Sequence, residues 1–380
     1  MADDLLSTPP PLAPPKAQAE MVSWLRLIRS HRVGISTFFR LMRDHGTATR
    51  ALAALPAIAN AAGVSHYTPC SEQQAAHELA LGQRAGAKLI YYGAQDYPAA
   101  LYDIADPPPL IWTLGNPQLL TRPAIALVGA RNASSLGRRM AHRLAGGLAE
   151  AGFAVVSGLA RGVDAAAHAA ALDHGTIAVQ AGGVDVIYPA ENTQLHQDIA
   201  QHGLRISEQP MGLQPIARNF PKRNRIISGL AQAVVVVEAA AKSGSLITAR
   251  NALDQGREVL VVPGHPFDGR SGGCNMLIRD GATLVRSVDD ILEALRPAEP
   301  VRDPPERPSA SAGPASQQQG DLSHEQILNL LGPTPIAEDQ LIRDLQRPAH
   351  LVAPQILALE MEGRITRQPG GLLSRATATA

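Results

Sequence analysis

Three hydrophobic patterns follow one another along this chain of 380 residues. The first, between residues 21 and 64, repeats at the three- and four-residue spacing that is typical of amphipathic helices. Its apolar positions are Trp24, Leu25, Leu27, Ile28, Phe38, Phe39, Leu41, Met42, Leu52, Leu55 and Ile58. The pattern predicts a small helical domain over residues 19–85. Residues 1–18 are rich in proline, and we expect them to form a disordered tail.

One turn of this helical region is similar to a phosphate-contacting hairpin. Residues 31–42 read H-R-V-G-I-S-T-F-F-R-L-M, which resembles a helix-hairpin-helix without its second glycine. The backbone of such a hairpin can contact a phosphate. The missing glycine favours the alternative, in which the SAM-like or helix-hairpin-helix-like bundle serves only for packing or dimer contact.

From about residue 107 the pattern changes to short, continuous apolar runs that alternate with alanine-rich helical stretches. The runs are residues 110–113, 125–128, 154–157, 177–180, 204–207, 234–238 and 258–262. Continuous apolar strands separated by helices are typical of a parallel sheet that is covered on both faces. We therefore predict a Rossmann-like, doubly wound α/β domain with a mostly parallel sheet over residues 86–296.

The third pattern follows a segment, residues 297–320, that is rich in Pro, Ser and Gln and reads as a flexible linker. Ser323 and Gln326 predict a capped helix that continues to Leu331. Two further helices fit residues 336–345 and residues 351–362. The sequence R-I-T-R-Q-P-G-G-L-L comes next and can form a short β-ribbon. Three helices and a ribbon predict a winged-helix domain over residues 321–380.

The last helix of this domain would be the recognition helix if the domain read DNA. It offers His350, Gln355, Glu360 and Glu362, and it contains no Lys or Arg. Contacts to bases and phosphates rely on cations. Protein contact, or a vestigial role, is therefore favoured over DNA reading for this domain.

Composition narrows the classes of function. The 34 Lys and Arg are balanced by 34 Asp and Glu, which excludes a wholly basic nucleic-acid binder and leaves only local patches. Cys70 and Cys274 have neither disulfide nor zinc spacing. The first residues carry acids and prolines where a secretory signal needs cations and an apolar run, and no apolar run is long enough to span a membrane. We expect a cytoplasmic protein with no membrane contact.

One local patch breaks the charge balance. Residues 217–225 read A-R-N-F-P-K-R-N-R, in which the four cations Arg218, Lys222, Arg223 and Arg225 surround Phe220 without any acid among them. A cationic segment with one aromatic residue indicates a polyanion, and nucleic acid in particular.

Four loops that follow predicted strands carry glycine, arginine or hydroxyl side chains. In open α/β sheets ligands bind beyond the carboxyl ends of the strands, so these loops are expected at one edge. The residues of interest are Gly129, Arg131 and Ser134; Gly158, Arg161 and Asp164; Gly182, Gly183, Asp185 and Tyr188; and Glu238, Ser243, Gly244, Ser245 and Thr248. Glycine lets the backbone approach an anion, arginine binds it bidentately, and a small-residue turn at a helix start offers unpaired N–H groups.

Each loop taken alone can also be a plain strand-to-helix turn. Ser134 can cap the helix that follows it. For Asp164, capping or pairing with Arg161 is favoured over catalysis. Tyr188 is expected to turn the chain, and Glu238 is expected to be hydrogen-bonded to backbone rather than to act as a general base.

The search for catalytic and metal-binding patterns is negative. There is no G-x(4)-G-K-[ST] sequence, so ATP hydrolysis of the P-loop type has no support. G-R-S-G-G at residues 269–273 matches the nucleophile-elbow string, but it lies in a long predicted loop. His168 with His174, and His196 with His202, are off the spacing that places two ligands on one helix face, so we read them as core or surface histidines. No catalytic residue, metal site or cofactor is predicted.

Taken together, the order and wording of these segments resemble the bacterial DNA-processing protein A (DprA/Smf) family. The resemblance is dense over residues 99–282. It rests on V-G-A-R-N-A-S-S-L-G, S-G-L-A-R-G-V-D-A-A-A-H, Y-P-A-E-N, S-E-Q-P-M-G, F-P-K-R-N-R-I-I-S-G-L, V-V-E-A, S-G-S-L-I-T-A-R, V-P-G and C-N-M-L-I-R-D-G-A. The helical domain and the winged-helix tail also look like accessories of this family.

The resemblance implies a cytoplasmic, non-enzymatic protein that binds single-stranded DNA on its Rossmann-like domain and forms a homodimer. It further implies protection of incoming DNA and loading of the RecA recombinase during natural transformation. The candidate DNA- or phosphate-binding residues are Gly129, Arg131, Ser134, Gly158, Arg161, Phe220, Lys222, Arg223, Asn224, Arg225, Ser243, Gly244 and Ser245.

Within this set the residues have different expected roles. Phe220 would stack a base, while Lys222, Arg223 and Arg225 would follow the DNA backbone. Asn224 and Arg225 can instead be structural. Ala130 stands where family members commonly have Ser or Thr, so one hydroxyl contact is absent from the first loop.

Two other functions are kept as alternatives. The lysine-decarboxylase-like nucleotide phosphoribohydrolases share a related Rossmann-type domain, but they require a P-G-G-x-G-T-x-x-E loop whose Glu assists bond cleavage. The comparable loop here is S-G-S-L-I-T-A-R, and no Glu occurs between Glu238 and Glu258. The other alternative is a recombinase-docking scaffold in which DNA contact is secondary, which the acidic last helix favours.

Overall fold

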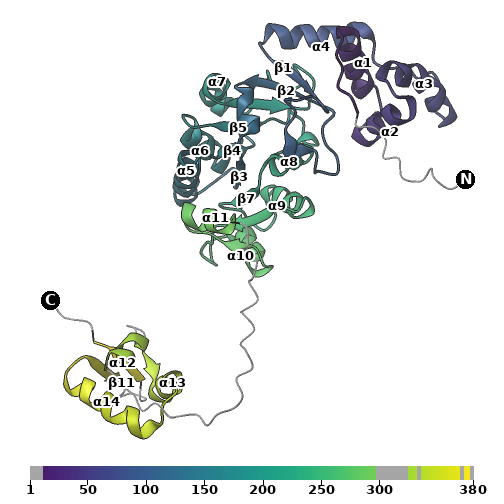
Figure 1. The fold of residues 1–380 in the computed structure, drawn as a ribbon. Helices are drawn as coiled ribbons and strands as arrows, with labels where there is room; N and C mark the ends of the chain where they lie inside the picture. The colour runs from purple at the N-terminus through teal and green to yellow at the C-terminus, as the bar shows by residue number, and fades with distance from the viewer. Residues whose placement is uncertain (1–11, 297–323, 332–334, 369–371, 377–380) are drawn as a thin grey trace, which may run out of the picture. The chain divides into compact units, whose positions relative to one another are not determined.

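The computed structural model of the chain describes residues 12–296, 324–331, 335–368 and 372–376. They belong to two compact units that divide between Ala298 and Glu299, and each is described by itself (Figure 1). The first unit contains the predicted helical and α/β domains, and the second contains the predicted winged helix. Most of the predicted tail, residues 1–11, and the whole predicted linker, residues 297–320, lie outside the described residues.

The helical domain forms as predicted, with four helices around one apolar cluster. The helices are α1 (Gln18–Arg29), α2 (Ile35–His45), α3 (Ala48–Ala61) and α4 (Glu72–Arg84). Trp24 packs edge-on against Phe38, with ring centroids 5.2 Å apart, and Leu25 and Leu41 are buried beside them. Leu12 packs against the same cluster, so the packed domain includes residues before the predicted boundary at 19.

The α/β domain contains a nine-stranded sheet within the described residues. The strands are β1 (Lys88–Tyr91), β2 (Leu110–Gly115), β3 (Ala124–Val128), β4 (Ala154–Ser157), β5 (Thr176–Val179), β6 (Leu204–Ser207), β7 (Ala233–Val236), β8 (Glu258–Val261) and β9 (Thr283–Leu284). Their order is β1-β2-β6-β5-β4-β3-β7-β8-β9. The pairs β1–β2 and β2–β6 are antiparallel, and all others are parallel, so the prediction of a mostly parallel sheet is confirmed.

Helices cover both faces of this sheet because alternate residues of each strand point to opposite sides. In β3, Ile125 and Leu127 join the cluster under α5 (Ser135–Glu150) and α6 (Val163–Ala171). Ala126 and Val128 join the cluster under α8 (Asn219–Leu230) and α9 (Ser245–Asp254). Figure 1 shows these two helix pairs on opposite sides of the sheet. The remaining helices are α7 (Thr193–His202), α10 (Gly272–Arg279), α11 (Val288–Ala294) and the short turns η1 (Ala99–Leu101), η2 (Pro117–Thr121) and η3 (Ala190–Asn192).

The strand order places a topological switch point between β3 and β7. The chain builds β4, β5 and β6 outward on one side of β3, and later β7, β8 and β9 outward on the other side. The loops that leave the carboxyl ends of β3 and β7 therefore diverge, and they leave a crevice of the kind in which ligands bind to open α/β sheets.

The second unit is a winged helix, as predicted. Its elements are α12 (His324–Leu330), β10 (Ile336–Ala337), α13 (Glu338–Asp344), α14 (Ala349–Met361), β11 (Ile365–Gln368) and β12 (Leu372–Arg375). The second helix was expected from residue 336, but Ile336 and Ala337 pair with Leu373 and Leu372 as a short strand. The third helix was expected from residue 351 and begins at Ala349. None of the helices over the described residues combines the length and apolar character needed to cross a bilayer.

Candidate nucleic-acid interface

Two neighbouring cavities open at the carboxyl edge of the sheet. One, of about 610 Å³, lies at the switch point between the loops that follow β3 and β7. The other, of about 440 Å³, lies over the loops that follow β4 and β5. Arg131, Ala160, Phe220 and Arg223 line both cavities, so these four residues form their common boundary. We call the two cavities together the cleft.

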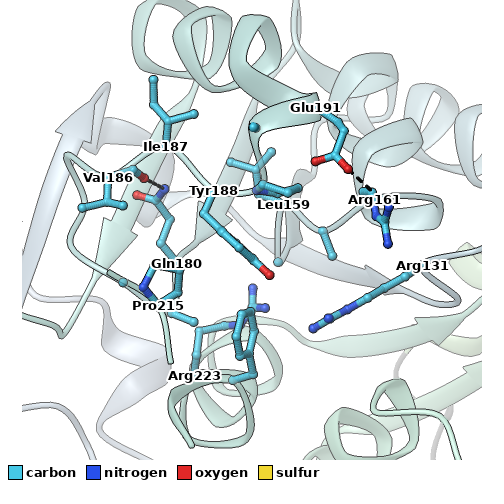
Figure 2. Close-up of a pocket in the computed structure, with 17 residues that line it drawn as sticks. Arg131, Leu159, Arg161, Gln180, Val186, Ile187, Tyr188, Glu191, Pro215 and Arg223 are labelled. Atoms are coloured by element: carbon cyan, nitrogen blue, oxygen red, sulfur yellow. Dashed lines mark hydrogen bonds and ion pairs between the residues drawn. The ribbon is translucent and has the colours of Figure 1, made fainter. Parts of the chain in front are cut away.

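An aromatic ring flanked by cations stands at this boundary. Phe220, in the first turn of α8, has the guanidinium carbon of Arg131 5.0 Å from its ring centroid and that of Arg223 6.0 Å away. The ring of Tyr188 lies 5.8 Å from the ring of Phe220. Figure 2 shows Tyr188, Arg131 and Arg223 pointing toward the same space. Arg131 is exposed and has no carboxylate partner among the described residues, so its charge is available to a ligand.

Arg223 is a buried cation at the floor of the cleft. Its side chain is almost inaccessible, and its Nη1 donates a 2.6 Å hydrogen bond to the carbonyl of Val179, while its Nε has no hydrogen-bond partner in the described part of the chain. Burial lowers the pKa of Arg223 to about 10, and the opposite charge of Asp164 limits the shift, so the group stays cationic at neutral pH. A buried, partly unpaired cation favours an anionic ligand in the cleft.

The loop that follows β4, which carries Gly158 and Asp164, packs around the guanidinium group of Arg223. A Cβ on Gly158 would lie 2.0 Å from Nη1 of Arg223, so only glycine leaves room for the arginine at this position. Asp164 accepts hydrogen bonds from the N–H groups of Gly158 and Ala160 at 3.2 and 3.3 Å. The loop-capping role expected for Asp164 is therefore confirmed, but the alternative, pairing with Arg161, is wrong because Arg161 pairs at the surface with Glu191 at 3.3 Å.

The loop that follows β3 is held in place by the loop that follows β7. Ser134 caps α5 as predicted, since its Oγ accepts a 2.9 Å hydrogen bond from the N–H of Gly137. Glu238 accepts hydrogen bonds from both the N–H and the hydroxyl of Ser134. The expectation that Glu238 binds backbone is confirmed. These contacts give Ser134 a structural role in shaping the loop that carries Arg131, and direct phosphate contact by Ser134 stays a prediction.

The start of α9 differs from the expectation of unpaired N–H groups. The N–H groups of Ser245, Leu246 and Ile247 all donate to acceptors of the same turn, namely Ser243 Oγ, the Ser243 carbonyl and the Gly244 carbonyl. The hydroxyl of Ser245 donates to the carbonyl of Gly129 at 2.7 Å. The turn closes on itself, so it borders the larger cavity without offering the row of free donors that the sequence predicted.

The basic segment of residues 217–225 runs into α8, and the helix divides its side chains between two faces. At 3.6 residues per turn, Phe220, Arg223 and Asn224 share one face of α8 and line the cleft. Lys222 and Arg225 project on the opposite side, where both line a third cavity. Arg225 pairs there with Asp106 at 2.9 Å and with Glu208, which is the structural role left open as its alternative.

Two residues of the cleft were not singled out as ligand-binding by the sequence. Tyr188 was expected only to turn the chain, yet its ring faces Phe220 across the smaller cavity. Gln180 follows β5 directly, and its buried Oε1 has no hydrogen-bond partner among the described residues. Gln180 could have been identified from the sequence, because it is a polar residue at the end of an apolar strand. Tyr188 had no signal, because its approach to Phe220 depends on the packing of two distant segments.

The comparison with family sequence models decides the relationship. The model described as DNA recombination-mediator protein A matches residues 88–296, more than half of the chain. The chain belongs to this family. The DprA-like N-terminal HHH domain matches residues 18–80, and the DprA winged helix domain matches residues 305–371. All three predicted domains of this DprA family member therefore have a counterpart in the family.

Curated relatives and solved structures point to the same family. The chain is 38% identical to protein Smf of Escherichia coli over 286 residues, which cover 74% of this chain and 76% of that protein. It is 43% identical to DprA of Bacillus subtilis over 220 residues, 57% of this chain and 74% of that protein. The crystal structure of DprA from Streptococcus pneumoniae matches with a TM-score of 0.54 and 38% identity, covering 62% of this chain and 86% of that one.

A further solved structure concerns a ligand. DNA processing protein A from Helicobacter pylori matches with a TM-score of 0.51 and 32% identity, over 55% of this chain and 95% of that one. The work on that structure describes the single-stranded DNA binding mode of the Helicobacter protein.

Proposed function

We propose that this DprA family member binds single-stranded DNA in the cleft, with one base on Phe220 and the adjoining phosphates near Arg131 and Arg223. The observation that carries the proposal is the aromatic ring between two guanidinium groups at the boundary of the two cavities. Aromatic rings stack bases of any sequence, and cations next to them neutralise the backbone. The single-stranded DNA binding of the Helicobacter relative supports the same ligand.

The position of the ring favours single strands over duplex. Phe220 is only partly exposed and lies between loops at the floor of the cleft. A base can reach it only after leaving its neighbours in the stack, which a single strand does at little cost and a duplex does not.

A binding role without catalysis is part of the proposal. Of the acids near the cleft, Glu238 is committed to Ser134, and Asp164 is committed to the backbone of its own loop. Glu191, at the rim of the smaller cavity, is paired with Arg161 at 3.3 Å. The described residues contain no cluster of metal-ligating side chains that would supply another route.

The wider role rests on the family. We propose that the protein is a cytoplasmic homodimer that protects incoming single strands and loads the RecA recombinase on them during natural transformation. The family description, a recombination mediator, supports transfer of DNA to a recombinase. The recombinase-docking scaffold differs from this proposal only in making DNA contact secondary, so measured DNA affinity separates the two.

The charge in the cleft is tested by Arg131→Gln. Fluorescence anisotropy of a labelled oligothymidylate should show tight, salt-sensitive binding by the wild type, with unlabelled duplex competing poorly. The variant should bind more weakly, and the slope of log K against log salt should become shallower by about 0.7 for each phosphate that the protein no longer neutralises. Equal affinity and slope in variant and wild type would place the DNA elsewhere.

Phe220→Leu is the matched test of stacking, because it changes no charge. The same titration should show a loss of about 1–3 kcal/mol in binding free energy with an unchanged salt slope. A Phe220→Leu protein that binds as tightly as the wild type would make Phe220 a packing residue.

A further inference from the structure

The last helix of the winged helix, α14, is apolar on two opposite faces. One face packs into the core of the second unit, and its members are the fully buried Val352, Ile356 and Leu359. The opposite face is open to solvent, and its side chains include Leu357, which is 57% exposed, and Met361, which is 83% exposed. A helix that is apolar on all sides is normally buried on all sides. The described part of the second unit therefore leaves one apolar surface of α14 uncovered.

The uncovered residues form one stripe along the helix. They are His350, Pro354, Leu357 and Met361. Their spacing of 4, 3 and 4 residues is that of the seam positions in a contact between two supercoiled helices. Glu360, the one Asp, Glu, Lys or Arg within these limits, lies about a quarter of a turn from the stripe and pairs with Arg367. The stripe therefore offers an uninterrupted seam to another helix.

The two ends of the stripe carry opposite charges. Arg347, just before the helix, is half-buried and has no carboxylate partner among the described residues. Glu362, just after the helix, is 46% exposed, and its contacts to His324 at 3.7 Å and to Arg364 at 3.8 Å are long. In an antiparallel pair of such helices Arg347 of each copy meets Glu362 of the other. A parallel pair would instead bring the two Arg347 side chains together.

A second copy of the chain is the occupant that fits both features. Nucleic acid does not fit, because α14 contains no Lys or Arg and the stripe is apolar. A two-fold contact uses the same surface on both subunits and must be complementary to itself. An apolar seam with opposite charges at its two ends meets this condition in the antiparallel orientation.

We propose that α14 pairs antiparallel with α14 of a second copy of this chain, with Leu357 near the two-fold axis and Arg347 against Glu362 at each end. The inference does not depend on single-strand binding in the cleft. It gives the winged helix the protein contact that its sequence favoured, and it assigns a contact surface to the homodimer proposed above.

The test is cysteine cross-linking of the full chain. Leu357→Cys is combined with Cys70→Ser, which leaves only the buried Cys274 as a native cysteine. A short bismaleimide should link two chains, because equivalent residues near a two-fold axis lie close together. Leu330→Cys in the same background is the matched control, since Leu330 is a 43% exposed apolar residue of α12 that lies outside the stripe. It should give several-fold less linked dimer.

Charge reversal tests the orientation of the pair. Arg347→Glu or Glu362→Arg alone should lower the yield of the Leu357→Cys dimer several-fold, because each sets like charges against each other. The two reversals together should restore the yield. Equal yields from Leu357→Cys and Leu330→Cys would overturn the inference, as would a double reversal that restores nothing.

Sedimentation of the same proteins separates this surface from the homodimer itself. A chain that sediments as a dimer but gives no link through residue 357 would refute the α14 contact and leave the proposed homodimer in place. A chain that sediments as a monomer at all concentrations would refute both.

Discussion

At the scale of single residues, the cleft depends on a buried cation and on the atoms that make room for it. Arg223 reaches its position because Gly158 has no side chain and because Val179 offers a carbonyl. Arg131, in contrast, is exposed, and its guanidinium lies over the face of Phe220. The buried charge of Arg223 shapes the cleft, while the exposed charge of Arg131 is accessible to a ligand.

A buried histidine fixes the loop that carries Gly158. The N–H of Leu159 donates to Nε2 of His168 at 3.2 Å, and Nδ1 lies 2.7 Å from the hydroxyl of Thr176. The hydroxyl donates in turn to the Val155 carbonyl, so Nδ1 carries the proton and the ring is neutral. Protonation of Nε2 would place its new N–H opposite the N–H of Leu159, and the hydrogen bond between them would be lost.

The stability of the fold should therefore fall at mildly acidic pH. Burial, reinforced by the charges of His196 and Arg223, lowers the pKa of His168 from 6.5 to about 3. Below pH 6.5 the unfolded chain binds a proton that the folded chain does not, so stability decreases as the pH falls. Urea unfolding should show that this group lowers the free energy of unfolding by about 1.4 kcal/mol at one pH unit below 6.5. His168→Gln should show a smaller drop between pH 7 and pH 5.5, and an identical drop would contradict the assignment.

The sequence could identify the main cationic and aromatic residues of the cleft but not their partners. The cationic segment and the Gly-Arg loops stand out locally, so Arg131, Phe220 and Arg223 were named. The contacts of Gly158 with Arg223 and of Tyr188 with Phe220 join segments far apart in the chain. No spacing rule reports them, because they arise only when the sheet and its helices are assembled.

At the scale of elements, α8 separates two surfaces. One face carries Phe220 and Arg223 to the cleft, while the opposite face buries Arg225 between Asp106 and Glu208. A run of basic residues in the sequence looks like a single patch. Helical geometry divides it, since residues two apart point in nearly opposite directions.

This division predicts different consequences for two neighbouring cations. Arg225→Ala leaves the largely buried carboxylate of Glu208 without its partner, so urea unfolding should show a loss of about 3 kcal/mol. Lys222→Ala removes an exposed side chain with no ion pair in the described structure, and stability should change by no more than about 0.5 kcal/mol. Equal stabilities of the two variants would mean that Arg225 is not a structural residue.

The elements themselves were predictable where the pattern is long. The parallel strands were recognised because they are buried on both faces and read as continuous apolar runs. The edge strands β1 and β9 were not predicted, since β9 has two residues, both exposed, and β1 has four residues of which the first, Lys88, is exposed. The strand at Ile336 was missed because two residues carry no periodicity, and only pairing with β12 defines it.

At the scale of the whole molecule, equal numbers of acids and bases are compatible with a polyanion ligand because the charges are unevenly placed. In the winged helix, Arg367 is neutralised by Glu338 at 2.6 Å and Glu360 at 3.2 Å, and α14 contains no Lys or Arg. In the first unit, Arg131 faces the cleft without a carboxylate partner among the described residues. The cation-flanked ring of Phe220 also lies in the first unit, so we place the proposed DNA contact there.

The most direct test of this assignment is photo-crosslinking of the full chain to an oligothymidylate that carries 5-iododeoxyuridine, followed by peptide mapping. We expect adducts on Phe220 and Tyr188, the two aromatic residues that face each other in the cleft, and absence of the Phe220 adduct in Phe220→Leu. Adducts confined to residues 324–376, with none in the cleft, would contradict it.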